Sequence, residues 1–415
     1  MINKTNKYAS KQAILTLLFI GWCIANLSRF TINYAILNIA KDFNINASMN
    51  GIVISSFFIG YALMQIPGGL LADKFGAKKV LLASAIIWSA AAAFTGFSWS
   101  VSSLIAFRFL TGVGVGIFYP TASRTIAQVF PRNSQGKAMS VLMVSGAVIG
   151  AVSSVLFAWI IGSMGWSALF FISGACGIII LASYLPLFNV APAVKENADN
   201  QTEVENTSVS PLKQVIRVPM VWGMFISGFC VSMITWGINS WIPTVLVQIR
   251  HIDLMQVGKY QVLPMIAGVV AMLLCGVIID KLQTSRIRIL AIILAVIAAV
   301  SIYLMYTSKI LALFFSFEGL TIACVTAVFV IITNLVMRQF PIQVTGSAIG
   351  FVNFGSQIGS FVAPAAMGFM VDANNGSFYM AFIFLAISAV IACFSFLPNY
   401  FLKKDVAIGT EHSAV

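Results

Sequence analysis

The sequence predicts an all-α membrane protein with twelve transmembrane helices, and three observations lead to this fold class. Of the 415 residues, 60% are hydrophobic and only 9% are charged, and the mean hydropathy is +0.96. Soluble domains carry about 25% charged residues, so no water-soluble fold covers this much apolar surface. Apolar runs of about 20 residues, the length that crosses a bilayer, recur along the whole chain. The net charge of +12 fits basic cytoplasmic loops and needs no nucleic-acid partner.

Charged residues, prolines and glycines divide the chain into twelve apolar segments. The first follows a lysine-rich start and has no cleavage-type ending, so we expect a helix rather than a removable signal peptide. The six cysteines all lie in apolar runs, where small buried hydrophobic side chains are expected rather than disulfides. The predicted spans are 14–40, 50–72, 79–98, 101–128, 137–162, 166–188, 219–248, 257–280, 287–307, 310–337, 345–371 and 376–403.

One long polar stretch, VKENADNQTEVENTSVSPLKQ (194–214), separates the sixth segment from the seventh. It holds four of the 12 acidic residues and cannot bury a core, which is typical of a flexible linker. We therefore predict an N-terminal six-helix bundle (1–188), a cytoplasmic linker (189–218) and a C-terminal six-helix bundle with a short cytoplasmic tail (219–415).

The loops alternate in basic content. Cytoplasmic loops of membrane proteins are enriched in Lys and Arg. With the N-terminus inside, the inner loops and tails collect 18 Lys and Arg residues and the outer loops collect 4. Both termini are therefore expected to face the cytoplasm.

The two halves resemble each other. Asp73 matches Asp280 after 207 residues, Gly146 matches Gly355 after 209, and Gly165 matches Gly376 after 211. Three anchors with nearly one offset predict two pseudo-symmetric six-helix bundles. Many membrane carriers are built from such repeats, with the substrate site near the midplane between them.

The stretch GGLLADKFGAKK (68–79) and Arg108 in RFLTGVGVG resemble signature motifs of the major facilitator superfamily, and the resemblance covers the whole chain. It implies a loop that latches helices in one of two access states. Asp73 is expected to cap the start of a neighbouring helix, where amide dipoles favour an anion. The residues assigned to this conformational latch are Gly69, Asp73, Gly76, Lys78 and Lys79, with Asp280 as the repeat counterpart.

Within that superfamily the sequence is similar to the anion:cation symporter group, through ALMQIPGGLLADKFG, FYPTASRTIAQVFP, WIPTVL and LPMIAG. Arg29 matches a first-helix arginine that binds the substrate carboxylate there. Three positions depart from the group: Ser28 replaces an acidic residue, Val115 replaces a glutamate, and a glutamine is missing around Ala147. The first two departures remove the usual proton carriers.

Three ionisable side chains fall well inside the predicted spans: Arg29, Arg108 and Glu318. A charge at the bilayer centre costs about 2.5–3.5 kcal/mol, so each is expected to face a cavity or a partner. The resemblance implies that helices one, four, seven and ten line the cavity. A guanidinium can hold a carboxylate through two parallel hydrogen bonds, and we assign this role to Arg29. The alternative is a pairing of Arg29 with backbone carbonyls or a distant carboxylate.

Glu318 lies 210 residues after Arg108, inside the repeat offset. A carboxyl group in an apolar surrounding can take up and release a proton near neutral pH. We expect Glu318 to carry the coupling proton, with Arg108 or Arg29 modulating it. The alternative is a static ion pair that supports the fold.

Small-molecule pockets combine aromatic rings with a few polar groups. Candidates for substrate contact besides Arg29 are Asn33, Tyr61, Gln65, Tyr119, Trp236, Asn239, Trp241, Asn353 and Gln357. For any one of them helix packing is the alternative role. The glycines of GVGVG (112–116) are interpreted as helix-packing residues rather than a nucleotide loop.

These features predict a monomeric secondary transporter of the inner membrane that moves a small organic anion by proton symport with alternating access. Its expected partners are a small-molecule substrate, protons and membrane lipid, with no nucleic acid, cofactor or metal. The sequence shows no catalytic group, so an enzyme is not expected. Alternatives are a carrier for amino acids or other small nutrients, an organophosphate exchanger, an efflux carrier and a transporter-like sensor.

Overall fold

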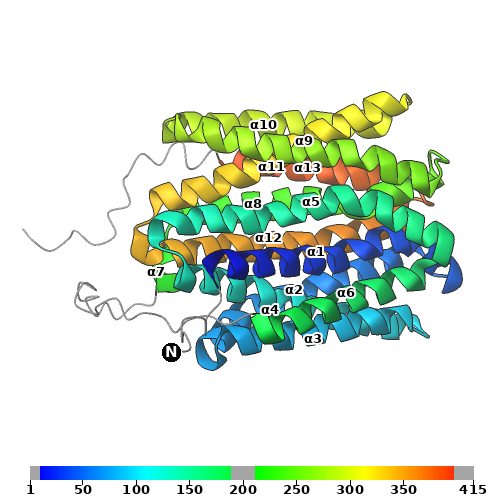
Figure 1. The fold of residues 1–415 in the computed structure, drawn as a ribbon. Helices are drawn as coiled ribbons and strands as arrows, with labels where there is room; N and C mark the ends of the chain where they lie inside the picture. Colours follow the sequence, from blue (N-terminus) through cyan, green and yellow to red (C-terminus); the bar gives the residue numbers. More distant parts are fainter. Residues whose placement is uncertain (1–9, 188–210, 397–415) are drawn as a thin grey trace, which may run out of the picture. The chain divides into compact units, whose positions relative to one another are not determined.

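The computed structural model describes residues 10–187 and 211–396, and every regular element in these ranges is a helix. The long N-terminal helices run roughly parallel or antiparallel to one another (Figure 1), and helices that are not consecutive in the chain pack together, such as the first with the fifth and the third with the sixth. The helices are α1 (Lys11–Asp42), α2 (Ala47–Phe75), α3 (Ala77–Gly96), α4 (Val101–Val129), α5 (Arg132–Met164), α6 (Trp166–Leu187), α7 (Pro211–Ile216), α8 (Pro219–Gln248), α9 (Leu254–Asp280), α10 (Thr284–Thr307), α11 (Leu311–Gln339), α12 (Ile342–Ala373) and α13 (Tyr379–Ser395).

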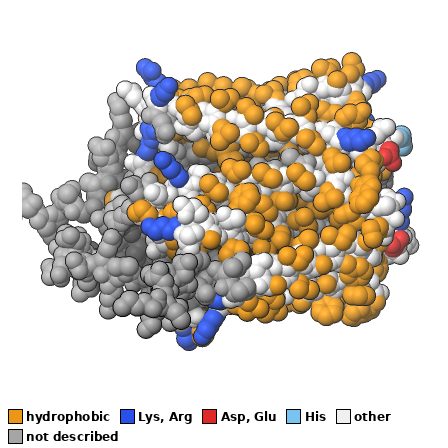
Figure 2. All heavy atoms as spheres, viewed as in Figure 1, with side chains coloured by type: hydrophobic (Ala, Val, Ile, Leu, Met, Phe, Trp, Pro, Cys, Tyr) orange, Lys and Arg blue, Asp and Glu red, His pale blue; other side chains and the backbone are white. Residues whose placement is uncertain are grey.

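Eleven of the described helices are long and apolar enough to cross a membrane, and α13 is a shorter apolar helix. Hydrophobic side chains cover most of the visible helix surface, whereas charged side chains lie near the helix ends (Figure 2). On α2, for example, Leu63, Ile66 and Leu70 are all more than half exposed at a spacing of three to four residues. A helix face of this kind fits lipid rather than water.

The structure modifies one end of the predicted linker. Residues 188–210 lie outside the described ranges, but Pro211–Ile216 forms the short helix α7. Val215 is fully buried, so this end of the linker packs against other residues. The reason is local: Pro211 is favourable at the first helical position, and Leu212, Val215 and Ile216 supply apolar side chains.

The described chain forms two compact units whose limits differ from the two predicted halves. Unit 1 combines 1–200 with two later segments, 239–265 and 364–376, and unit 2 combines 201–238, 266–363 and 377–415. The ends of α8 and α12 and the start of α9 therefore belong with α1–α6. The division into two six-helix bundles stays a prediction.

The helices repeat along the chain at the spacing seen in the sequence. Helices α4 and α11 are both 29 residues long and begin 210 residues apart. In unit 1, α3 packs against α4 and α6; in unit 2, α10 packs against α11 and α13. The matched glycines Gly165 and Gly376 both have positive φ, +83° and +85°. Helix order, helix partners and these two turns thus recur with nearly one offset.

Candidate functional site

Arg29 lies near the middle of α1 and faces an aromatic surface of α2. Its guanidinium carbon is 5.0 Å from the centre of the Phe58 ring, 5.2 Å from that of Tyr61 and 5.9 Å from that of Phe57. These distances are within the range of cation–π attraction. The Arg29 side chain stays partly exposed, whereas Phe57, Phe58 and Tyr61 are buried. Three buried rings of α2 therefore lie against the Arg29 cation.

Glycines on α4 bring this aromatic surface into position. A Cβ atom on Gly112 would lie 2.0 Å from the Phe57 carbonyl oxygen, and one on Gly116 would lie 2.5 Å from that of Tyr61. Such distances are far below van der Waals contact, so the backbones of α2 and α4 touch because these residues have no side chain. The prediction that GVGVG packs helices is confirmed, and the packing also sets where the Phe57 and Tyr61 rings lie.

Arg108, on α4, is buried in the same region, with an exposed fraction of 1%. Its Nη1 donates to the Ser28 carbonyl oxygen at 3.0 Å, and its guanidinium carbon is 5.0 Å from the centre of the Phe57 ring. The Ser28 hydroxyl lies 2.6 Å from the Ser173 hydroxyl of α6. Arg108 therefore binds the α1 backbone at the residue that precedes Arg29.

The other predicted site residues of the N-terminal helices are more scattered. Asn33 is buried one turn along α1 from Arg29. Gln65 Nε2 lies 3.5 Å from the Gly116 carbonyl oxygen of α4. Tyr119 is partly buried, and its ring centre is 5.6 Å from that of Trp22. The geometry joins Arg29 and Tyr61 directly, whereas substrate contact by Asn33, Gln65 and Tyr119 stays a prediction.

In unit 2, Glu318 on α11 has an exposed fraction of 0%. One turn further along α11, Thr321 lines a cavity of about 20 Å³ together with Thr235, Ile238 and Thr326. This volume holds about one water molecule. Gln357 Nε2 lies 3.5 Å from Asn353 Oδ1 on α12, as their spacing of four residues predicts.

Trp236, Asn239 and Trp241 lie on α8, where unit 2 ends and unit 1 resumes. Trp236 and Asn239 are partly buried. Trp241 is 1% exposed, and its Nε1 donates to the Pro364 carbonyl oxygen at 3.1 Å. Within unit 1 this indole joins the end of α8 to the end of α12, a structural use that the sequence pattern did not indicate.

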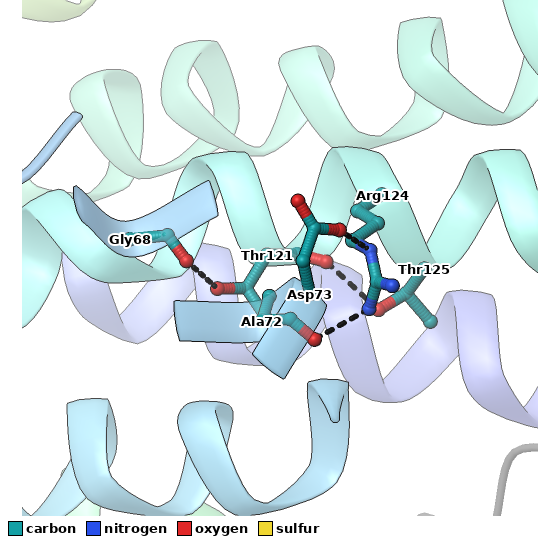
Figure 3. Close-up of polar contacts among 6 residues, drawn as sticks. All are labelled: Gly68, Ala72, Asp73, Thr121, Arg124 and Thr125. Carbon is teal, nitrogen blue, oxygen red and sulfur yellow. Dashed lines mark hydrogen bonds and ion pairs between the residues drawn. The ribbon is translucent and has the colours of Figure 1, made fainter. Parts of the chain in front are cut away.

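The predicted latch at the end of α2 contains an ion pair between Asp73 and Arg124 of α4 (Figure 3). The same arginine donates from Nη1 to the Ala72 carbonyl oxygen at the end of α2. Gly76, with φ of +85°, makes the turn into α3, which has no side-chain cap. Lys78 Nζ donates to the Leu185 carbonyl oxygen of α6 at 2.7 Å. Asp73 thus binds a guanidinium of its own unit.

Unit 2 repeats the contact between an arginine and the carbonyl oxygens at a helix end. Arg338, near the end of α11, donates to the carbonyl oxygens of Ile279 and Leu282 at 2.9 Å each. Ile279 lies in the last turn of α9 and Leu282 just after it, as Ala72 lies near the end of α2. Asp280 is the last residue of α9, but its side chain lies outside the described residues. Gly69 and Lys79 lie in α2 and α3.

At the other end of α2, a carboxylate from a distant part of the chain binds the first turn. Asp372 of α12 accepts hydrogen bonds from the amides of Ala47 at 3.1 Å and Ser48 at 2.7 Å. The two helices touch here, because a Cβ atom on Gly51 would lie 2.4 Å from the Pro364 carbonyl oxygen. All of these residues belong to unit 1. We refer to Ala47, Ser48, Gly51, Pro364 and Asp372 as the α2–α12 clamp.

Comparison with known proteins identifies the family. The model of the Major Facilitator Superfamily matches residues 18–364. The chain belongs to the Major Facilitator Superfamily. It is therefore a multi-span membrane transporter and not an enzyme, and the resemblance noted in the motifs is confirmed.

Similar proteins include a "Probable sulfoacetate transporter SauU" of Cupriavidus necator, 28% identical over 95% of each chain. A "Probable galactarate/D-glucarate transporter GarP" of Escherichia coli is 27% identical over 96% of each chain. Among solved structures, a bacterial homolog of the human lysosomal transporter Spinster, in an inward-facing and occupied conformation, superimposes with a TM-score of 0.81. It is 17% identical, and the match covers 96% of this chain and 99% of that one, so it supports the fold alone.

Sequence reasoning missed the residues that position the two arginines. Phe57 and Phe58 carry no charge and look like ordinary lipid-facing residues. The only available signal was that Phe57 and Tyr61 lie four apart on one face of a helix. Asp372 was also missed, because nothing near it in the sequence shows that its carboxylate binds α2.

Proposed function

We propose that this protein is a secondary active transporter that moves a small organic anion across the inner membrane, with the anion held by Arg29. The observation that carries the proposal is a partly exposed arginine at the middle of a membrane helix, with its guanidinium against three aromatic rings. Placing a permanent cation in the middle of a membrane costs free energy. Binding an anionic cargo at this position would offset part of that cost. The names of the relatives, a sulfoacetate transporter and a galactarate/D-glucarate transporter, support an anionic cargo.

A thermal-shift screen of the purified protein tests this proposal. Probes are sulfoacetate, galactarate, amino acids and sugar phosphates, and each is compared for wild type, Arg29→Ala and Arg29→Lys. A ligand that binds only the folded protein raises its apparent stability by mass action. Arg217→Ala is the matched control, because Arg217 is exposed beyond α7.

We expect a carboxylate to stabilise wild type and the Arg217→Ala variant but not Arg29→Ala. Arg29→Lys keeps the charge but loses the planar fork, so its stabilisation should be smaller than that of wild type. An anion that stabilises Arg29→Ala as strongly as wild type would refute the role of Arg29. Stabilisation by zwitterionic amino acids alone would favour an amino-acid carrier.

We further infer that Glu318 takes up and releases the coupling proton. It is a fully buried carboxyl group in a membrane helix, and a water-sized cavity lined by threonines begins one turn away. A carboxyl group can accept and release a proton, and the cavity has room for about one water molecule that could carry it.

The test is uptake into proteoliposomes driven by an imposed pH gradient. Glu318→Gln should bind and exchange the anion but lose pH-driven accumulation, whereas Glu318→Asp should retain part of it. Glu318→Gln that still accumulates the anion under a pH gradient would refute the proton role.

Alternating access is the mechanism that we propose for this transport. The Asp73–Arg124 pair lies at the α2–α3 end of unit 1, and the α2–α12 clamp lies at the opposite end of α2. With the N-terminus in the cytoplasm, the first is at the inner side and the clamp at the outer side. Each is suited to hold one access state closed, and breaking either should change the balance between the states.

A further inference from the structure

Two buried or partly buried cations share one aromatic ring in unit 1. The guanidinium carbons of Arg108 and Arg29 are 5.0 Å and 5.9 Å from the centre of the Phe57 ring. Arg29 is partly exposed, whereas Arg108 is 1% exposed and has no direct access to a ligand. A guanidinium keeps its proton under physiological conditions, so Arg108 adds a fixed positive charge next to the anion site.

The carboxylates in the described part of unit 1 lie at helix ends, away from this pair. Asp42 ends α1 and binds the Trp166 indole, and Asp73 pairs with Arg124. Asp253 precedes α9 and binds the Met255 amide, and Asp372 binds the first turn of α2. In the described part of unit 1, each of these four carboxylates thus binds a group other than Arg108.

The polar contacts of Arg108 itself are with neutral groups. Its Nη1 donates to the Ser28 carbonyl oxygen at 3.0 Å, and its Nε makes no hydrogen bond among the described residues. Ser28 is uncharged and 2% exposed, and its hydroxyl shares a hydrogen bond with the hydroxyl of Ser173. Dipoles stabilise the guanidinium but leave its net charge to act on neighbouring groups.

We propose that Arg108 is a specificity-determining residue that makes this transporter select doubly charged anions. This inference rests on the proposed function of Arg29. One negative charge of the cargo binds Arg29 directly, and the second is favoured by the field of Arg108 without contact. At a separation of about 10 Å and an effective dielectric constant of about 20, a fixed charge favours the dianion over the monoanion about tenfold.

The test compares two probes with the same six-carbon skeleton: galactarate, which has two carboxylates, and galactonate, which has one. Dissociation constants are measured by calorimetry for wild type, Arg108→Gln, Ser28→Asp and Ser28→Asn. Ser28→Asp places a carboxylate beside an intact Arg108, and Ser28→Asn is its uncharged match. This pair decides the question even where Arg108→Gln does not fold, because both retain the buried arginine.

Wild type should bind galactarate about tenfold more tightly than galactonate, and Ser28→Asn should keep this ratio. In Ser28→Asp, and in folded Arg108→Gln, the ratio should fall close to one. A merely structural role of Arg108 would weaken both anions equally and leave the ratio unchanged.

A wild-type ratio near one, or an unchanged ratio in Ser28→Asp, overturns the inference while anion binding through Arg29 still stands. Binding of neither probe, nor of sulfoacetate, contradicts the proposed function and overturns this inference with it. The two failures are thus distinguishable.

Discussion

The α2–α12 clamp predicts a measurable local loss of stability when its carboxylate is removed. The first four amides of a helix have no partner within the helix. In α2, Asn46 supplies acceptors for Met49 and Asn50, and Asp372 supplies the acceptors for Ala47 and Ser48. Asp372→Ala therefore leaves two amides that only water can satisfy.

The expected size follows from these two bonds. Hydrogen bonds to a charged group contribute about 1.5–3 kcal/mol when buried, and Asp372 is only partly buried. We therefore take the lower end, about 1.5 kcal/mol in total, which corresponds to roughly a tenfold change in the local opening equilibrium.

Hydrogen–deuterium exchange with mass spectrometry measures this opening directly, because exchange reports local as well as global unfolding. The peptide that contains residues 47–51 should exchange about tenfold faster in Asp372→Ala than in wild type. Asp253→Ala is the matched control, because Asp253 caps only its own helix through the Met255 amide. An exchange rate of residues 47–51 that is equal in both variants would refute the role assigned to Asp372.

Three further predictions follow from packing and polar contacts. Gly112→Val should lower the melting temperature in detergent and weaken anion binding, because its Cβ would lie 2.0 Å from the Phe57 carbonyl oxygen; Gly136→Val, whose Cβ would meet nothing within 4 Å, should change neither. Arg124→Gln should cost about 1 kcal/mol or less, since its ion pair with Asp73 is largely exposed, yet it should alter the rate of anion exchange in proteoliposomes; an unchanged rate would contradict the latch. Trp166→Phe should destabilise the protein by about 1 kcal/mol in thermal melts, because it removes the 2.6 Å bond to Asp42; an unchanged melting curve would contradict a stabilising role for this bond.

Much of the fold could be predicted because it depends on local properties of the chain. Helix spans follow from runs of apolar residues, and most predicted spans overlap a described helix of similar length. The repeat offset predicted that Arg108 and Glu318 occupy corresponding helices, and both lie on helices of equal length, α4 and α11. The exception is the end of the linker, where the six residues PLKQVI, with apolar Leu212, Val215 and Ile216, form a helix inside a polar segment.

The candidate site could be predicted only in part. Arg29 was conspicuous because a charge inside an apolar run is rare. Its aromatic partners were not, since Phe57 and Phe58 differ in no visible way from other phenylalanines of the chain. Trp241 looked like a pocket residue, but its indole binds the Pro364 carbonyl oxygen 123 residues away, and sequence spacing does not indicate such a partner.

Composition, hydropathy and charge distribution were enough to indicate a multi-span membrane transporter, because a bilayer imposes length and polarity on every helix separately. Tertiary structure decided which group each charged side chain binds. Asp73 pairs with Arg124 of its own unit, Arg108 binds the backbone beside Arg29, and Asp372 binds a helix more than 300 residues away in the chain. These contacts depend on how closely the helix backbones approach, which glycines such as Gly51 of α2 and Gly112 of α4 permit but no single stretch of sequence specifies.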